Sequence, residues 1–120
     1  HDALPIFNLK GLVSQRLLPL QEGKGRIAAV EIMLNTPLVA DMIFKGEVGE
    51  IKELMKRSVE LGMQTFDQAL FDLYEAGKVT YDDALRNADS VNDLRLQIKL
   101  NSQRARNQDL SAGTEHFQIV

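Results

Sequence analysis

Residues 25–37 read GRIAAVEIMLNTP, and this stretch decides how the rest of the chain is interpreted. From Arg26 to Leu34, apolar side chains occupy both alternating faces, which is typical of a strand covered on both sides. Thr36 and Pro37 then form a helix start, because threonine caps a first turn and proline needs no hydrogen bond there. The stretch therefore predicts a strand that runs directly into a helix.

Before this strand, the spacing of apolar residues over residues 8–17 predicts the end of a helix, which Pro19 would stop. Residues 21–25 read QEGKG, and their two glycines suit a hairpin turn. The glycine-lysine pair in this loop is no phosphate loop, because the required earlier glycine and the hydroxyl after the lysine are missing.

After the strand, the pattern predicts a series of short helices. They are a helix from Pro37 closed by Gly46, one over residues 48–61 ended by Gly62, one opened by a Thr65/Gln68 capping box, a short one capped by Thr80, and a last one from Ser90 to about Ser102. From residue 103 onward the sequence has few apolar residues and no period, so we predict a mobile tail over residues 103–120. The predicted fold class is α+β and mostly helical.

Composition narrows the possible functions. A chain of 120 residues that is 44% hydrophobic supports one compact core. The net charge of -3 is spread along the chain, so we expect no nucleic-acid partner. There is no cysteine, and the two histidines lie at opposite ends, so we expect no metal site. No apolar run approaches the roughly 18 residues that span a bilayer, so we expect no membrane insertion.

Two sets of side chains are candidates for function. Glu31 lies in the middle of the strand, where a bare carboxylate is costly, so it either meets a partner such as Arg16 or Arg26 or takes part in a nucleotide or subunit contact. Phe44 lies off the apolar stripe of its helix and is a candidate contact residue. With it, the candidate interface comprises Leu38, Val39, Asp41, Met42, Phe44 and Lys45.

The acidic residues of the later helices are predicted to form a solvated face, because no glycine turn brings them together around a cation. These residues are Asp67, Asp72, Glu75, Asp82 and Asp83. No catalytic, cofactor-binding or metal-binding residue is predicted in this chain.

Three segments together resemble the C-terminal end of the type IV pilus retraction ATPases of the PilT/PilU type. They read LKGLVSQRLLP over residues 9–19, GRIAAVEIMLNTP over residues 25–37 and GMQTFDQAL over residues 62–70. The resemblance extends over about residues 8–100, and no single segment in it is a catalytic signature.

The resemblance implies a cytoplasmic, hexameric motor that uses ATP and Mg²⁺ to retract pili in twitching motility, with its catalytic residues upstream of this chain. It implies that residues 7–36 end a RecA-like core, with the hairpin completing its sheet, and that residues 37–102 form a C-terminal helical bundle at the subunit boundary. Residues 1–6, HDALPI, match nothing expected there and are predicted to be a non-native leader. The fragment alone is expected to be inactive.

One departure favours the PilU-type accessory paralogues. Where the retraction ATPase proper carries two arginines in the helix after the threonine-proline start, this chain has Ala40 and Phe44. The partners implied are further copies in a homo-hexamer, a paralogous retraction ATPase, and the pilus platform at the inner membrane. Two alternatives stay open: a free-standing helical interaction module that binds through Phe44 and the stripe over residues 38–43, and a related secretion or pilus assembly ATPase.

Overall fold

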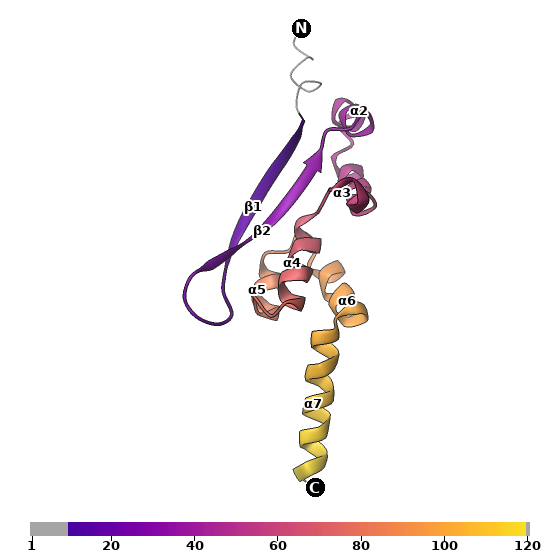
Figure 1. Ribbon diagram of the computed structural model, residues 1–120. Helices are drawn as coiled ribbons and strands as arrows, with labels where there is room; N and C mark the ends of the chain where they lie inside the picture. The colour runs from indigo at the N-terminus through magenta and orange to yellow at the C-terminus, as the bar shows by residue number, and fades with distance from the viewer. Residues whose placement is uncertain (1–9, 120) are drawn as a thin grey trace. The chain divides into compact units, whose positions relative to one another are not determined.

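The computed structural model describes the backbone of residues 10–119 and the side chains of residues 10–112. Figure 1 shows the elements, which are β1 (Gly11–Pro19), β2 (Arg26–Leu34), α2 (Pro37–Lys45), α3 (Val48–Lys56), the short 3-10 helix η1 (Val59–Leu61), α4 (Phe66–Glu75), α5 (Tyr81–Arg86), α6 (Val91–Asn101) and α7 (Gln103–Ile119). The described chain is thus mostly helical with one strand hairpin, as predicted. The predicted leader over residues 1–6 lies outside the described residues.

The two strands pair with each other in a two-stranded sheet, and the loop between them is a hairpin turn. Gly23 and Gly25 have φ angles of 84° and 112°, which favour glycine, and the Leu20 N–H donates to the Gly25 carbonyl at 3.1 Å. The turn prediction over residues 21–25 is therefore confirmed.

The predicted helix over residues 8–17 is wrong, because residues 11–19 form strand β1. Residues 8 and 9 lie outside the described residues. Gly11 lies close to β2: a Cβ there would lie 2.7 Å from the Met33 carbonyl oxygen, so only glycine allows this approach. Leu12 and Val13 are 49% and 73% exposed, so their helix-like spacing does not mark a buried face. Pairing with β2 overrides the local pattern.

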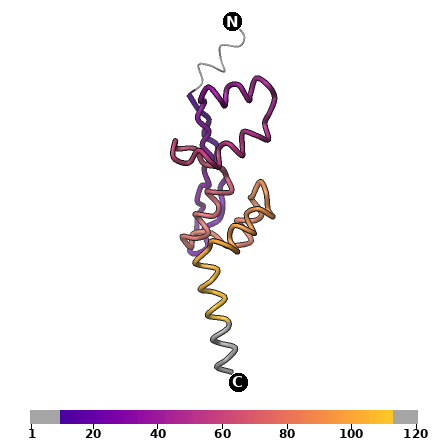
Figure 2. The backbone as a smooth tube through the Cα atoms, turned by 90° about the vertical axis from the view of Figure 1, so that its right-hand side faces the viewer, coloured from indigo at the N-terminus to yellow at the C-terminus, as the bar shows by residue number. Residues whose placement is uncertain are grey.

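The chain divides into two compact units rather than the one compact core that its composition predicted, and the division passes through both strands and α4. Unit 1 comprises His1–Leu17 and Ala28–Ala69, and unit 2 comprises Leu18–Ile27 and Leu70–Val120. Figure 2 follows the backbone through these segments.

Unit 1 has its core under α2 and α3. The buried side chains there are Val39, Ile51, Met55 and Met63, with Met33, Leu34, Met42, Ile43 and Leu54 packed against them. Helix α2 begins and ends as predicted: the Thr36 hydroxyl accepts from the Val39 N–H at 3.2 Å, and Gly46 has a φ of 71°.

The single helix predicted over residues 48–61 is interrupted. Helix α3 ends at Lys56, and η1 follows before Gly62, which has the positive φ of 96° expected at a helix end. The buried Ser58 hydroxyl donates to the Leu54 carbonyl at 2.7 Å, and the Arg57 N–H donates to the same oxygen at 3.1 Å. A side chain that competes for helix carbonyls in this way ends a helix early.

The segment before α4 joins the free edge of β2. Ile32 and Gln64 exchange two backbone hydrogen bonds of 2.8 and 2.9 Å in an isolated antiparallel bridge. The predicted capping box then opens α4: the Thr65 N–H donates to the Gln68 Oε1 at 2.9 Å, and the Gln68 N–H donates to the Thr65 hydroxyl at 3.2 Å.

Unit 2 is built on the second half of α4 and on the helices after it. Its fully or almost fully buried side chains include Leu18, Leu70, Tyr74, Val79, Ala84, Leu94 and Ile98. Thr80 caps α5 as predicted, since its hydroxyl accepts from the Asp83 N–H at 3.1 Å. Helix α6 follows Ser90 and closes at Ser102. Within the predicted mobile tail, Gln103–Ile119 forms the helix α7, so the lack of an apolar period there did not mean a lack of regular structure. The mobility of the tail stays a prediction.

Candidate functional site

Glu31 of β2 is at the centre of a polar junction in unit 1. Its side chain is 14% exposed. One carboxylate oxygen, Oε2, accepts from the Phe66 N–H at 2.9 Å, and the other, Oε1, pairs with the Lys52 ammonium. A carboxylate at this place satisfies a first-turn N–H of α4 and complements the helix dipole. Glu31 therefore ties β2 to the start of α4 and to α3.

The bridge of Glu31 was predicted with Arg16 or Arg26, and this choice of partner is wrong. Lys52, one helix away in the sequence, pairs with it instead. Arg26 is exposed at the start of β2. Arg16 belongs to the same junction in another way, because its guanidinium carbon lies 3.9 Å from the centre of the Phe66 ring.

Phe66 is the buried aromatic residue of the junction. The residue is 6% exposed, and the Lys52 Nζ lies 5.7 Å from its ring centre, farther than the Arg16 guanidinium. Two cations over one buried ring are each attracted by its negative face. Cations from β1 and α3, the carboxylate of β2 and the first residue of α4 thus meet in one place.

Gln64 adds a further tie between β2 and the segment before α4. Its side-chain Nε2 donates to the Val30 carbonyl at 2.6 Å, beside the backbone bridge with Ile32. Neither Gln64 nor Lys52 was predicted from the sequence as a site residue. For Gln64, the only indication in the sequence was its place in the GMQTFDQAL segment. For Lys52, nothing distinguished it from the other residues of its predicted helix.

The junction is suited to holding elements together rather than to acid–base chemistry. The Glu31 carboxylate is engaged by a lysine and a backbone N–H, a pairing that serves structure rather than proton transfer. Within the described part of the chain, no group of three or more histidine or acidic side chains could hold a metal ion. Nor does any helix described here have the length and apolar character needed to cross a membrane.

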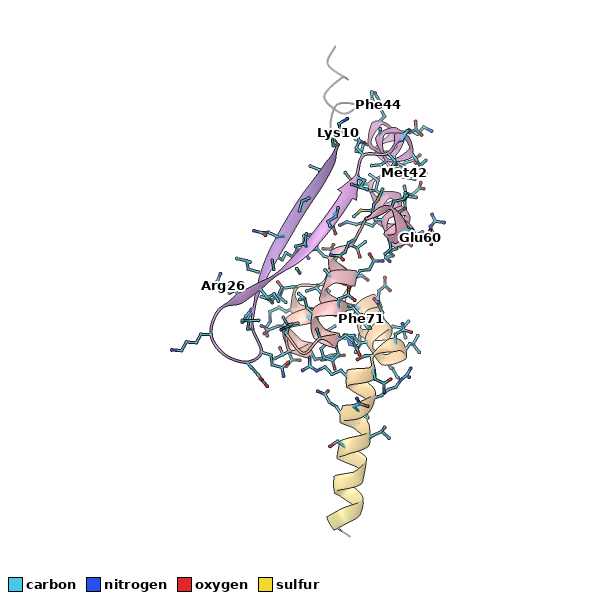
Figure 3. The ribbon with its side chains drawn as sticks, in the orientation of Figure 1. Lys10, Arg26, Met42, Phe44, Glu60 and Phe71 are labelled. Atoms are coloured by element: carbon cyan, nitrogen blue, oxygen red, sulfur yellow. The ribbon has the colours of Figure 1, made fainter. Side chains whose placement is uncertain are left out.

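The predicted interface on α2 separates into surface and core. Leu38 and Phe44 are 51% and 55% exposed, and Figure 3 labels Phe44 and Met42 on this helix. Val39 is fully buried in the core of unit 1, and Met42 is half-buried against it. Only part of the predicted set is therefore available to another molecule.

The other two members of the predicted set form an ion pair on the surface of α2. The Lys45 Nζ lies 2.9 Å from the Asp41 Oδ2, and both side chains are more than half exposed. The hydrogen bond and the charge of Asp41 raise the pKa of Lys45. Lys45 therefore stays positively charged beside the exposed Phe44.

The predicted solvated acidic face does not hold for three of its members, Asp67, Glu75 and Asp83. Asp67 is only 9% exposed, and Glu75 is half-buried and accepts the N–H groups of Gln103 and Arg104 at 2.9 and 3.1 Å. Asp83 pairs with Arg86 on α5 at 2.8 Å. Glu75 is thus a second structural carboxylate, this time in unit 2.

Comparison with known proteins shows close relatives among pilus ATPases. The chain is 65% identical over 97 residues to the type IV pilus ATPase PilU of Pseudomonas aeruginosa, a match that covers 81% of this chain and 25% of that protein. It is 33% identical over 81 residues to the type IV pilus retraction ATPase PilT of the same organism, which covers 68% of this chain and 23% of that protein. A twitching motility protein of Neisseria gonorrhoeae matches with 33% identity over 81 residues, 68% of this chain and 22% of that protein.

These matches confirm the resemblance to the PilT/PilU type. Identity to PilU, at 65%, is about twice the 33% identity to PilT, so the chain is of the PilU type over the matched residues. The chain spans about a quarter of the length of the curated relatives that it matches. No protein-family model matches it.

Proposed function

We propose that this chain, which is related to the PilU-type pilus ATPases, is the C-terminal part of a cytoplasmic ATP-hydrolysing motor that takes part in pilus retraction. The observation that carries the proposal is the 65% identity over 97 residues to PilU of Pseudomonas aeruginosa. In the complete protein, ATP and Mg²⁺ would be held by residues upstream of this chain. The fragment itself is expected to hydrolyse no ATP.

The proposed role of this part is to transmit motion inside a subunit of a homo-hexamer. The Glu31 junction supports this role because it joins four elements, β1, β2, α3 and α4, through a few polar contacts. A displacement of the hairpin would pull directly on the start of α4 through the Glu31 carboxylate. Packing alone would allow more slippage than this pair of charge-assisted contacts.

The hairpin is proposed to complete a RecA-like sheet. Strand β1 supports this, because it exposes Leu12, Val13 and Leu17, at 49%, 73% and 51%. Apolar residues on an exposed strand are a liability that further strands or helices commonly cover. The rest of a larger sheet, supplied by the complete protein, would cover them.

The exposed part of α2 is proposed to face a neighbouring subunit or a partner. Leu38 and Phe44 offer apolar area, and the Asp41–Lys45 pair offers both charges at its side. Candidate partners are a second copy in the ring, a paralogous retraction ATPase, and the pilus platform at the inner membrane. An apolar centre with charged neighbours is the composition expected of such a contact.

A test uses the complete parent gene, which is expected to encode a Gly-x-x-x-x-Gly-Lys-Ser/Thr phosphate loop upstream of residue 8. Cells that lack the parent would receive the wild type, Glu31→Ala, or the exposed-loop control Glu22→Ala. We expect Glu31→Ala to reduce twitching and Glu22→Ala to leave it unchanged, at equal protein levels. A complete gene without a phosphate loop, or full twitching with Glu31→Ala, would contradict the motor and the transmission role respectively.

A second candidate is a free-standing helical interaction module, which the exposure of Leu38 and Phe44 favours. The two functions predict different results for the isolated chain. A module would bind its partner without the rest of the parent, and a Phe44→Ala variant would lose that binding. A motor fragment would need the complete protein for any effect on pili.

A further inference from the structure

The sequence of α7 alone does not account for the stability of this helix. Its side chains from Arg106 to Ala112 are exposed, and most of them are polar. Isolated helices of about this length are marginal in water, because nucleation is costly and packing supplies most of the stability. Something outside the helix must therefore supply the stability of its start.

The first turn of α7 is capped by two residues of unit 2. Glu75, the last residue of α4, accepts through Oε1 from the N–H groups of Gln103 and Arg104 at 2.9 and 3.1 Å. The Ser102 hydroxyl accepts from the Ala105 N–H at 3.0 Å. All three N–H groups of the first turn are thus satisfied, and a carboxylate lies at the positive end of the helix dipole.

Arg104 fastens the same turn to the rest of unit 2. Its guanidinium donates to the Tyr74 carbonyl at 2.7 Å and the Val79 carbonyl at 2.9 Å, and its carbon lies 4.4 Å from the centre of the Tyr74 ring. The planar fork of arginine suits several acceptors and an aromatic face at once, which lysine does not match. The start of α7 is therefore held on the end of α4 and on the turn after it.

The hairpin loop reaches the same place. The Arg104 guanidinium also donates to the Gln21 side-chain carbonyl, and the Gln21 N–H donates to the Lys78 carbonyl at 2.8 Å. Gln21 thus contacts both the turn before Val79 and the first turn of α7. One residue of α7, Arg104, thus contacts both the hairpin loop and the end of α4 with the turn after it, two segments that lie far apart in the sequence.

We propose that Glu75, Arg104 and Gln21 form a latch that keeps α7 helical and couples its order to the position of the hairpin loop. While the latch is closed, the first turn is nucleated and the exposed turns after it propagate. When the latch opens, the caps are lost and α7 melts from its start. This inference rests on contacts within unit 2 and does not depend on the motor function proposed above.

Amide hydrogen exchange on the 120-residue chain tests the latch. The variants Glu75→Ala and Arg104→Ala remove the capping carboxylate and the guanidinium, respectively, without lowering helix propensity, because alanine is the best helix former. We expect exchange over residues 104–112 to become roughly 5-fold to 30-fold faster, the range that a lost cap and a lost charged contact give. The control Glu22→Ala, in the exposed hairpin loop, should change it less than about 2-fold, the usual size of exposed-site effects.

The order of α4 separates release of α7 from general unfolding. Amides of Leu70 and Leu73 should stay protected in a variant that only opens the latch. If Arg104→Ala also exposes these amides, the test of the latch uses Glu75→Ala and the milder Arg104→Lys instead, because both leave the core residues in place. Unchanged exchange of α7 in Glu75→Ala and in Arg104→Lys would overturn the latch.

The coupling to the hairpin has its own test. Gln21→Ala removes one contact of Arg104 and leaves the caps at Ser102 and Glu75, so we expect a smaller acceleration in α7, roughly 2-fold to 5-fold. The variant should also speed exchange in the loop at residues 20–25. Faster exchange in the loop with no change in α7 would overturn the coupling to the hairpin.

Discussion

Removing the Glu31 carboxylate should destabilise the chain by more than removing the lysine that pairs with it. Glu31 makes two contacts, to the Phe66 N–H at 2.9 Å and to the Lys52 ammonium. In Glu31→Ala the Phe66 N–H, at the start of α4, loses its acceptor, and the Lys52 ammonium loses its carboxylate. Hydrogen bonds to charged groups contribute about 1.5–3 kcal/mol, so we expect a loss of about 2–3 kcal/mol in the free energy of unfolding.

The Lys52 contact should account for the smaller share. The Lys52 side chain is 40% exposed, and ion pairs that water reaches contribute about 0–1 kcal/mol. Lys52→Ala should therefore cost about 0.5–1 kcal/mol, part of it from the contact with the Phe66 ring. Glu31→Gln keeps an acceptor for the Phe66 N–H and loses only the charge, so its cost should lie between these values.

Urea unfolding followed by circular dichroism measures these differences, and a double-mutant cycle isolates the pair. The Glu31→Ala, Lys52→Ala and double variants should give a coupling of about 0.5–1 kcal/mol. Glu22→Ala, in the exposed hairpin loop, is the matched control and should change stability by less than about 0.5 kcal/mol. An equal loss of stability in Lys52→Ala and Glu31→Ala would refute this prediction, because the cap of α4 would then not be the larger contribution.

Three further predictions concern the core, a helix end and pH. Leu70 is fully buried, so Leu70→Ala should cost about 2–5 kcal/mol, and an unchanged thermal midpoint would contradict its place in the core. Gly46 has a φ of 71° and open space at its Cβ position, so Gly46→Ala should cost about 1–2 kcal/mol from backbone strain alone, and a neutral urea midpoint would argue against the left-handed helix end. The Ser102 hydroxyl, the backbone N–H groups of Arg104 and Gln103 and the charge of Arg104 lower the pKa of Glu75 in the folded chain, against the effect of burial. The stabilisation from Glu75 is therefore complete above its ordinary carboxyl pKa of 4.5 and is lost as the pH falls through the lower folded value. As the pH of the wild-type chain is lowered, α7 should lose ellipticity at a higher pH than the pH at which α4 loses amide protection.

Local patterns predicted the helix ends well because those ends depend on residues close in sequence. Thr36, Thr65 and Thr80 each accept an N–H three residues ahead, and Gly46 and Gly62 close the elements before them. Such contacts need no knowledge of the remaining chain. The strand from Arg26 to Leu34 was recognisable for the same reason, because the run of apolar residues on both faces lies within the strand itself.

The errors share a different cause, which is contact between distant residues. Strand β1 has helix-like spacing, but it pairs with β2, and Gly11 lies against the Met33 carbonyl oxygen. Helix α7 has no apolar period, but residues about thirty positions earlier hold its first turn. The partner of Glu31 was misassigned because Lys52 is 21 residues away in the sequence. No local rule ranks such a lysine above Arg16 of the neighbouring strand or Arg26 of the same strand.

Glu31 and Glu75 show one physical arrangement in both units of the chain. In each case, a carboxylate on an earlier element accepts first-turn N–H groups of a later helix, Phe66 for α4 and Gln103 and Arg104 for α7. In each case a cation also lies over an aromatic ring beside it, Arg16 over Phe66 and Arg104 over Tyr74. A helix held at its N-terminus in this way has a fixed start, because its first N–H groups have no other acceptor of equal strength. The start of α4 is therefore fixed within unit 1 by Glu31, and the start of α7 within unit 2 by Glu75. A chain with both carboxylates removed should retain the α2 and α3 core while α4 and α7 lose their fixed starts.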